Sequence, residues 1–365
     1  MNTEPLKQLD MWIHPKDLIE LKKDIWNDEP VEAILKTGQT TKSHIYVSYR
    51  GSHIRKLKKK SYQIEYRKPK QRQGESIFHL NAEYNDPSFI RNRLSFYFFE
   101  QMGVLSPAAS HVFLTINGRK EGIYLKIESV DELFIQKRQL AEGGIYYAVD
   151  DDANFSLLSS FDKKPKKHLL LGYEKKTGTS QHDQQLSEFI YFLNTAKDDT
   201  FAEKIEQYLD VTQYFHWLIG VVCTQNFDGF VHNYALYVNE QGRFQVLPWD
   251  YDATWGRDIH GEEMAFDYIP VNGFNTLTAR LLDIPSFKRS YYTLFQHVLD
   301  THFIEDRLCP IIEKWHKSIE DRIGDDPYTK DRKDILQSER DLIRQYINKR
   351  RRYLQSEIRK EIFGT

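Results

Sequence analysis

Hydrophobic residues near the start of the chain recur with the period of a helix. Leu18, Leu21 and Ile25 lie three or four residues apart, so a helix would gather them on one face. Pro15 precedes them, and Pro is favoured in the first turn of a helix. The pattern predicts one early helix within residues 11–35.

A shorter period governs the segments that follow. Apolar and polar side chains alternate at residues 45–49 and again at 62–66, which predicts antiparallel strands. Asp86-Pro87-Ser88 then opens a segment of helical period. Residues 112–127 carry Asn117-Gly118 between two apolar arms, and this turn sequence is typical of a β-hairpin. The first part of the chain is therefore predicted to be a sheet with one inserted helix.

The second part of the chain is predicted to be mainly helical. Helical periods occupy residues 186–193, 201–209 and 212–224, and charged helical segments follow Pro285. A short hairpin interrupts the helices at residues 234–247, where a Gly-containing turn joins two apolar arms.

Together these elements predict an α+β fold with two lobes. We expect a β-rich lobe over residues 1–145 and a mostly helical lobe over residues 146–365, with the change between Asp131 and Asp150. The length of 365 residues agrees with two units, because one domain accounts for ~150 residues. The sequence contains neither an internal repeat nor a long low-complexity linker.

Composition excludes several classes of protein. The chain has 51 Lys and Arg against 53 Asp and Glu, and a net charge of −2 does not suit a general binder of nucleic acid or anionic membranes. An apolar content of 40%, with 14% aromatic residues, is too high for a disordered chain. Cys223 and Cys309 do not form a metal-like pair, so a disulfide scaffold or a thiolate zinc site is not expected.

The same sequence features predict where the protein is found. Residues 1–10 are polar and lack the apolar core of a secretory signal. Apolar runs stay well short of the ~20 residues that span a bilayer. We therefore expect neither a signal peptide nor a membrane span, and a reducing, intracellular location.

The segment from Asn226 to Asp252 carries most of the candidate chemistry. Asp228 ends an apolar helix, Asn233 follows five residues later, and Asp250 comes at a strand end across the predicted hairpin. Protein kinases use a catalytic loop of the form D-x-x-x-x-N and a later metal-binding Asp. Carboxylate and amide oxygens are also the ligands that Mg²⁺ prefers. The spacing alone is weak evidence for a catalytic loop, because Asp228 and Asn233 could equally be turn residues and Asp250 a helix cap.

A second candidate region lies in the predicted β-rich lobe. Arg50-Gly51-Ser52 forms a turn that can approach a phosphate closely, and a basic strand follows it. By alternation Lys60 shares a face with Tyr62 and points inward, whereas Lys59 points the other way. An inward Lys requires an anionic partner, which would be a carboxylate or the phosphates of a ligand. The remaining basic residues of 56–72 fit a solvated edge strand, without the interleaved aromatics of a single-stranded nucleic-acid site.

Several segments, in their order along the chain, resemble the spore coat protein H (CotH) kinase family of endospore-forming bacteria. The resemblance runs over nearly the whole chain. The segments that carry it are Tyr49-Arg-Gly-Ser52, Lys59-Lys-Ser-Tyr62, His79-Leu-Asn-Ala-Glu-Tyr84, Asp86-Pro-Ser88, Arg91-Asn92, Gly122-Ile-Tyr-Leu125, Glu128, Asp150-Asp-Asp-Ala-Asn-Phe155, the segment from Asp228 to Asn233, and Trp249-Asp-Tyr-Asp252. The resemblance implies one atypical, two-lobed protein-kinase-like domain over residues 1–365 in place of two independent units.

The resemblance also implies an activity. A member of this family would transfer the γ-phosphoryl group of ATP to Ser residues of spore coat proteins, with Mg²⁺ or Mn²⁺ as the metal. Family substrates include repetitive coat proteins rich in Ser and in Lys or Arg, so such proteins are the implied partners, with neither nucleic acid nor a membrane among them. The implied location is the mother-cell cytoplasm and then the spore coat.

Residue roles are carried over by motif. Asp228 would be the catalytic residue, and Asn233 and Asp250 would hold the metal. The residues implied to bind ATP are Lys60, Arg50, Ser52, Tyr146 and Trp249. Of these, Tyr146 and Trp249 would enclose the adenine. The chain lacks the G-x-G-x-x-G loop, the His-Arg pair before the catalytic Asp and the D-F-G of ordinary protein kinases, and these absences are normal for the family.

Several neighbouring residues have two interpretations. Glu83 or Glu128 could pair with the inward Lys, as a helix Glu does in ordinary kinases, or could be a surface or hinge carboxylate. Asp252 could hold the metal in place of Asp250, or could orient Asp250. Asp150-Asp151-Asp152 fit a solvated acidic loop better than a cation site. His232 could touch substrate, although a single His is weak evidence for a metal or a base.

Two other functions are compatible with the same residues. A catalytically silent scaffold could use the fold to organise coat assembly. A metal-dependent phosphohydrolase would also need clustered acids, and it would release free phosphate without forming a phosphoprotein.

Overall fold

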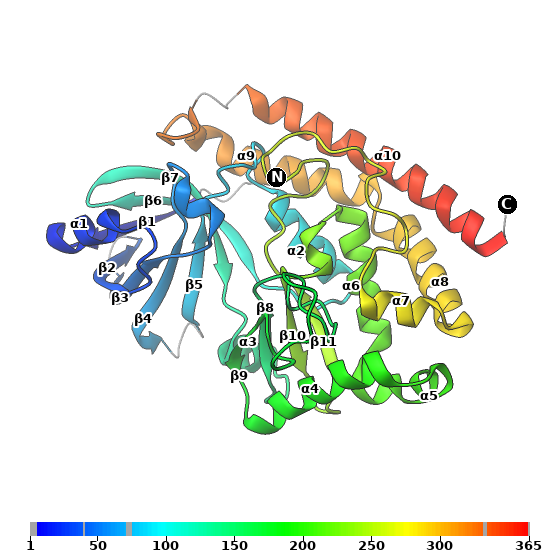
Figure 1. Cartoon of the computed structure of the whole chain (residues 1–365). Helices are drawn as coiled ribbons and strands as arrows, with labels where there is room; N and C mark the ends of the chain where they lie inside the picture. The colour runs from blue at the N-terminus through cyan, green and yellow to red at the C-terminus, as the bar shows by residue number, and fades with distance from the viewer. Residues whose placement is uncertain (1–5, 39–40, 71–74, 331–333, 364–365) are drawn as a thin grey trace.

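A closed β-barrel occupies one side of the molecule and a larger helical part, with its own sheet, occupies the other (Figure 1). The computed structural model describes residues 6–38, 41–70, 75–330 and 334–363. The barrel order is β1-β2-β3-β4-β5-β7-β6, closed by a parallel pairing of β1 with β6. Its strands are β1 (Lys7–Ile13), β2 (Val31–Thr37), β3 (Thr41–Tyr49), β4 (Tyr62–Lys70), β5 (Glu75–Asn81), β6 (Ala109–Ile116) and β7 (Arg119–Glu128). Every second side chain points inward, and these side chains fill the barrel with a hydrophobic core.

The start of the chain differs from the single helix predicted within residues 11–35. The structure has β1, then α1 (Pro15–Lys23), then β2. Leu9, Met11 and Ile13 alternate on β1 and are buried in the barrel. A strand of this length holds too few residues for its period to stand out from that of the helix next to it, so the pattern showed only the helix.

The helical part is built around a four-stranded antiparallel sheet in the order β11-β10-β8-β9. These strands are β8 (Ile145–Ala148), β9 (Tyr173–Thr177), β10 (Tyr234–Val238) and β11 (Phe244–Pro248). The helices are α3 (Glu132–Lys137), α4 (Ser180–Thr195), α5 (Asp198–Tyr208), α6 (Val211–Thr224), α7 (Thr276–Leu282), α8 (Pro285–Thr301), α9 (Glu305–Ile323) and α10 (Ile335–Phe363). The predicted helices before and after the hairpin are confirmed, as is the mixed helix-and-sheet composition. Across the described residues, no helix is both long enough and apolar enough to cross a membrane.

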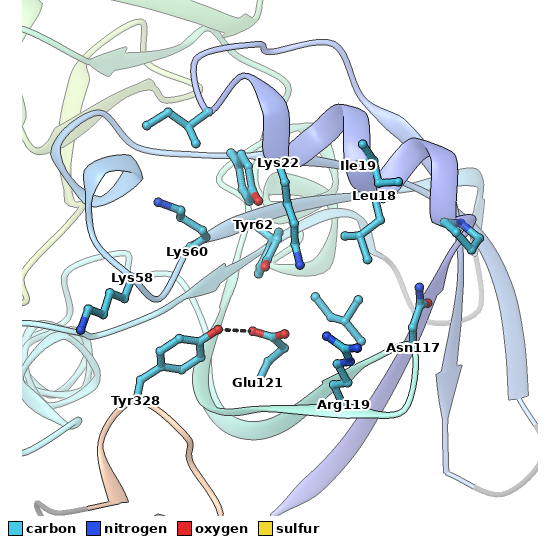
Figure 2. A pocket seen from close by; sticks show the side chains of 14 residues that line it. Leu18, Ile19, Lys22, Lys58, Lys60, Tyr62, Asn117, Arg119, Glu121 and Tyr328 are labelled. Carbon is cyan, nitrogen blue, oxygen red and sulfur yellow. Dashed lines mark hydrogen bonds between the residues drawn. The ribbon is translucent and has the colours of Figure 1, made fainter.

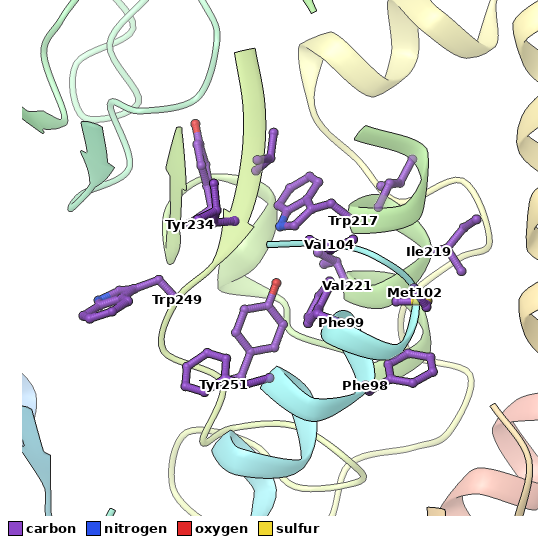
Figure 3. Packing of buried hydrophobic residues seen from close by; sticks show 14 of the residues in the cluster. Phe98, Phe99, Met102, Val104, Trp217, Ile219, Val221, Tyr234, Trp249 and Tyr251 are labelled. Atoms are coloured by element: carbon purple, nitrogen blue, oxygen red, sulfur yellow. The ribbon is translucent and has the colours of Figure 1, made fainter. Parts of the chain in front are cut away.

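The inserted helix α2 (Arg91–Gln101) lies between β5 and β6 in sequence but packs into the core of the helical part. Figure 3 shows Phe99 of α2 beside Val221 of α6. The two helices approach closely at Gly220, where a Cβ atom would lie 2.1 Å from a ring carbon of Phe99. Only a residue without a side chain fits there, so this glycine sets how near α2 can come to α6.

The turn that follows α9 fastens the helical part to the barrel through a buried ion pair. Lys59 Nζ lies 2.7 Å from Asp326 Oδ2, and both side chains are fully buried. The same carboxylate oxygen accepts a hydrogen bond from the backbone N–H of Ile123 on β7 (2.9 Å). Lys59 is therefore the buried lysine with an anionic partner, contrary to the prediction that it points away from the core. The alternation was extended too far, because β4 begins only at Tyr62.

We expect Asp326→Asn to destabilise the protein by about 3–5 kcal/mol, because it leaves the Lys59 ammonium buried without a counter-charge. Guanidinium unfolding of the purified variant measures this change. Asp325→Asn is the matched control, since Asp325 pairs with Lys120 at the surface and such pairs contribute under about 1 kcal/mol. Equal losses in the two variants would contradict a special role for the buried pair.

Candidate active site

One side chain, Asn226, holds the loop that follows α6. Its amide oxygen accepts a hydrogen bond from the backbone N–H of Gly229 (3.2 Å), and its amide nitrogen donates to the carbonyl of Asp250 (3.3 Å). Asp228 begins the short 3-10 helix η2 (Asp228–Phe230) in this loop. The tie through Asn226 brings the Asp228 carboxylate close enough to Asp250 for their charges to interact.

Asp228 also faces a histidine. The Nε2 atom of His232 lies 3.8 Å from Asp228 Oδ2, and the Nδ1 atom of the same ring lies 2.8 Å from Asp151 Oδ1. Burial raises the pKa of Asp228, and the charges of Asp151 and Asp250 raise it further, while His232 opposes them. A carboxyl with a raised pKa is a better proton acceptor than an ordinary one.

Asn233 and Asp250 lie on facing ends of the β10–β11 hairpin. The carbonyl of Asn233 accepts a hydrogen bond from the N–H of Trp249 (3.2 Å), and its own N–H donates to the carbonyl of Ala148 on β8 (3.2 Å). Asn233 and Asp250 both have left-handed backbones, with φ of 58° and 59°. Such a conformation is uncommon for residues other than glycine and often occurs at functional sites.

Glu83 joins Asp250 and Asp252 in a cluster of acidic side chains. Burial raises the pKa of Asp252 to about 8, and the charge of Asp250 raises it in the same direction. Burial also raises the pKa of Glu83 well above its usual range, followed by the charge of Asp252. Asn92 of α2 fixes this arrangement, because it donates to Glu83 Oε1 (3.2 Å) and accepts from the N–H of Tyr251 (3.1 Å). The Glu83 Oε2 atom has no hydrogen-bond partner in the described structure.

Arg50 brings a positive charge to the acids from the barrel. It follows β3 directly, and its guanidinium donates a hydrogen bond to the Oδ1 atom of Asn81 at the end of β5. Burial lowers the pKa of Arg50, while the charges of Asp250, Tyr147, Glu83 and Asp252 oppose that shift. Barrel and helical part therefore contribute opposite charges to one junction.

An aromatic group lies beside Arg50 at this junction. Trp249 packs against Tyr147 with ring centroids 4.7 Å apart, against His79 at 5.3 Å, and under the guanidinium of Arg50 at 5.4 Å. The His79 side chain is buried, yet neither ring nitrogen has a hydrogen-bond partner in the described structure. Burial lowers the pKa of His79 well below its usual range, and Arg50 and Lys176 lower it further, so the ring is neutral. Buried polar atoms without partners need an explanation, and a bound ligand is one.

Two residues predicted to bind ATP lie elsewhere. Tyr146 is buried on the opposite face of β8, where its hydroxyl donates to Asp183 Oδ1 (2.8 Å). Successive side chains of a strand point to opposite faces, so its neighbour Tyr147 faces Trp249 instead. Lys60 lines a cavity at one end of the barrel, and its ammonium donates to the carbonyls of Arg55 and Leu57.

Other predicted residues differ in what they contact. Ser52 is exposed and precedes the 3-10 helix η1 (His53–Lys56), without a capping hydrogen bond from its side chain. Glu128 pairs with Lys137 and Arg138, each at 2.8 Å, so its partner is not Lys60. Asp152 accepts hydrogen bonds from Ser159 and Ser160 and thereby holds its own loop, whereas Asp151 reaches His232.

The structure adds residues that sequence reasoning missed. Tyr147, His79 and Asn92 all contact the site, yet none was singled out as a candidate. Alternation along β8 could have suggested Tyr147 as readily as Tyr146. His79 and Asn92 lie within segments that carry the family resemblance, but no chemical signal in the sequence distinguished them from core residues.

The acids of the described residues do not make a metal site by themselves. Within the described residues, no group of three or more His, Cys, Asp and Glu side chains is arranged to hold a metal ion. Mg²⁺ usually takes only one or two protein carboxylates and completes its coordination with water and phosphate oxygens. A site of that kind would need the nucleotide as well as the protein.

Comparison with known proteins identifies the family. Residues 47–354 match the family model described as CotH kinase protein. The chain belongs to the CotH kinase family. Over 97% of its length this CotH-family chain is 50% identical to "Inner spore coat protein H" of Bacillus subtilis (strain 168), of which it covers 97%. It is 36% identical to the "Inner spore coat protein H-like protein" of the same organism, over 83% of this chain and 87% of that one.

Solved structures are much less similar. HipA of Shewanella oneidensis MR-1, determined with HipB and operator DNA, matches with a TM-score of 0.33 and 12% identity. The match covers 98% of this chain and 75% of the other. A similarity this low supports no statement about the CotH-family fold.

The acidic cluster leads to a prediction about stability and pH. The pKa of Asp252 is about 8 in the folded chain and about 4 when unfolded. Between about pH 4 and pH 8 Asp252 is protonated in the folded chain and ionised in the unfolded chain. The free energy of unfolding therefore falls as pH rises through this range, and above about pH 8 the stabilisation from the bound proton is gone. We expect the melting temperature of Asp252→Asn to fall less between pH 6 and pH 9 than that of the wild type. Both are measured in EDTA, which keeps divalent ions from the acids. Asp199→Asn on α5 is the control, and a slope equal to that of the wild type in both variants would contradict the assignment.

Proposed function

We propose that this CotH-family chain is a protein serine kinase that transfers the γ-phosphoryl group of ATP to spore coat proteins. The observation that carries the proposal is the junction of barrel and helical part, where Asp250 interacts with both Asp228 and Arg50 and where neither ring nitrogen of the buried His79 has a hydrogen-bond partner in the described structure. Family membership supports it, as does the name of the Bacillus subtilis relative. We place the activity in the mother-cell cytoplasm and then in the spore coat.

ATP would bind with its base against the aromatic group. Trp249 and Tyr147 supply the aromatic rings, and His79 supplies two ring nitrogens that can hydrogen-bond to the nucleotide. Arg50 would contact the phosphates, because its guanidinium already lies beside the acids. It takes the role that the sequence resemblance gave to Lys60, whose ammonium is bound to two carbonyls at the barrel end.

The acids suit a divalent cation such as Mg²⁺ or Mn²⁺. The fit rests on the donor set: neighbouring carboxyl oxygens on Asp250 and Asp252, and an oxygen of Glu83 without a hydrogen-bond partner in the described structure. Asp250 and Asn233 would hold the ion, with Asp252 beside them. When bound, the ion would neutralise charge on the phosphates.

Asp228 would serve the acceptor serine. The serine Oγ forms a bond to the γ-phosphorus as the bond from that phosphorus to the bridging β–γ oxygen breaks, and ADP leaves with the electron pair of the broken bond. The hydroxyl proton passes to the Asp228 carboxylate. His232, held by Asp151, faces this carboxylate.

A groove next to Asp228 supports a basic acceptor. It has a volume of about 440 Å³, and Asp258 and Glu263 line it together with Asp228. Phe227 and Tyr268 add exposed aromatic rings at its wall, with centroids 5.9 Å apart. Acids and aromatic faces together suit a serine flanked by Lys or Arg. We therefore propose Ser-rich, basic coat proteins as the substrates.

Replacement of the acceptor-facing acid tests the kinase assignment. We expect Asp228→Asn to lower phosphate transfer by about 10²-fold or more, because it removes the proton acceptor while keeping the shape of the side chain. Transfer from γ-labelled ATP to a Ser- and Lys-rich peptide measures it. Asp267→Asn, an exposed acid outside the groove, should keep the wild-type rate.

The same assay separates the other functions. Release of free phosphate by the wild type, with no phosphopeptide formed, would replace the kinase assignment with a phosphohydrolase. If neither free phosphate nor phosphopeptide forms, the chain is a silent scaffold. Unchanged transfer in Asp228→Asn would remove Asp228 from the mechanism.

Two adjacent tyrosines test where the base binds. We expect Tyr147→Leu to weaken ATP binding about tenfold, since a base–aromatic stack contributes about 1–3 kcal/mol. Tyr146→Leu removes a ring of the same size from the opposite face of β8, so ATP binding should change little. Titration calorimetry with a non-hydrolysable ATP analogue and Mg²⁺ measures both, after melting curves confirm folding. A larger loss of ATP affinity in Tyr146→Leu than in Tyr147→Leu would show that adenine binds at Tyr146, as the sequence resemblance implies.

A further inference from the structure

A cavity lies at one end of the barrel, separate from the groove beside Asp228 (Figure 2). Its volume is about 670 Å³. Helix α1, the segment between η1 and β4, the β6–β7 hairpin and Tyr328 form its walls. Mouths of β-barrels are common places for ligands, and this volume is within the usual range of binding pockets.

The cavity carries a surplus of positive charge. The cations that line it are Lys22, Lys58, Lys60 and Arg119, against one carboxylate, Glu121. Glu121 already accepts a hydrogen bond from the Tyr328 hydroxyl (2.9 Å). Figure 2 shows Lys22 and Arg119 directed toward the space around Glu121.

Three of these cations are available to a ligand. Lys60 is held by the carbonyls of Arg55 and Leu57. For Lys22, Lys58 and Arg119, which are exposed, the described structure contains no salt bridge and no side-chain hydrogen bond. They come from α1, from the segment before β4 and from the β6–β7 hairpin, so one ligand could join three parts of the barrel mouth.

The floor of the cavity is aromatic and apolar. Tyr49 and Tyr62 are buried there with ring centroids 5.5 Å apart, and Ile116 lies beside them. Burial raises the pKa of Tyr49 to about 12, so its hydroxyl stays protonated and does not repel an anion. The cavity thus combines cations at its rim with an apolar surface below them.

We propose that this barrel-mouth pocket binds a phosphoserine of a substrate segment that is already phosphorylated. A phosphoserine carries close to two negative charges, which matches the surplus of cations around Glu121. Neighbouring apolar atoms of the segment would cover Tyr49 and Tyr62. The inference rests on the proposed function, since the kinase reaction supplies the phosphoserine. A primed Ser-rich protein would then be held at the barrel while further serines reach Asp228.

Binding of a fluorescent phosphoserine peptide to the full chain tests the pocket. We expect the Lys22→Glu and Arg119→Glu double variant to bind it about tenfold more weakly or worse, because two attractions become repulsions. Lys23→Glu is the matched control, since Lys23 is the exposed neighbour of Lys22 on α1 but does not line the cavity. Added salt should weaken wild-type binding more than that of the double variant.

Three results would overturn the assignment. They are equal binding of the unphosphorylated peptide, an equal loss in Lys23→Glu and in the double variant, and displacement of the peptide by inorganic phosphate at the same concentration. The last would show that the pocket takes free phosphate and not a peptide segment.

Turnover separates this inference from the proposed function. With a primed peptide, the double variant should raise KM several-fold and keep the wild-type kcat, while an unprimed peptide should show no change. An absence of any transfer in the wild type would refute the kinase assignment, whereas Lys22-dependent binding of the phosphopeptide would still support the pocket. Normal phosphate transfer, together with phosphopeptide binding that does not depend on Lys22, would refute the pocket and leave the kinase assignment standing.

Discussion

The burial of three acids together, Glu83, Asp250 and Asp252, is the constraint on which the rest of the site depends. Burial, and then the neighbouring charges, raise the pKa values of Glu83 and Asp252, so the fold must hold these acids together at the cost of keeping protons on them. It does so with neutral ties and one guanidinium: Asn92 links Glu83 to the backbone of Tyr251, and Arg50 lies across the junction. Side chains from α2 and from the end of barrel strand β3 therefore hold the acids together.

Local chemistry in the sequence predicted one half of the site better than the other. Asp228, Asn233 and Asp250 come from one short loop and one hairpin, so their spacing along the chain translates into proximity, and the structure brings them together. Lys60 and Tyr146 were assigned by alternation and by resemblance. Their positions depend on where β4 begins and on which face of β8 meets the barrel, and no neighbouring residue specifies either.

The fold shows the same division. The hairpin and the long helices have periods that a single sequence reveals, and these elements are confirmed. Closure of the barrel depends on a parallel pairing between β1 and β6, which lie about a hundred residues apart in sequence. A pairing between strands so far apart produces no pattern in the local sequence, so β1 was not predicted next to α1. The ion pair between Lys59 and Asp326 is equally non-local and equally invisible to pattern.

The placement of α2 has a consequence for motion. The chain leaves the barrel after β5, packs α2 into the helical core, returns as β6, and leaves again after β7. Several covalent connections and the buried ion pair of Asp326, just after α9, therefore hold the two parts together, in place of a single flexible hinge. A protein joined in this way opens its junction mainly by moving side chains and loops. Exchange of a bound molecule would then be governed by residues such as Arg50 and Trp249, and not by separation of whole lobes.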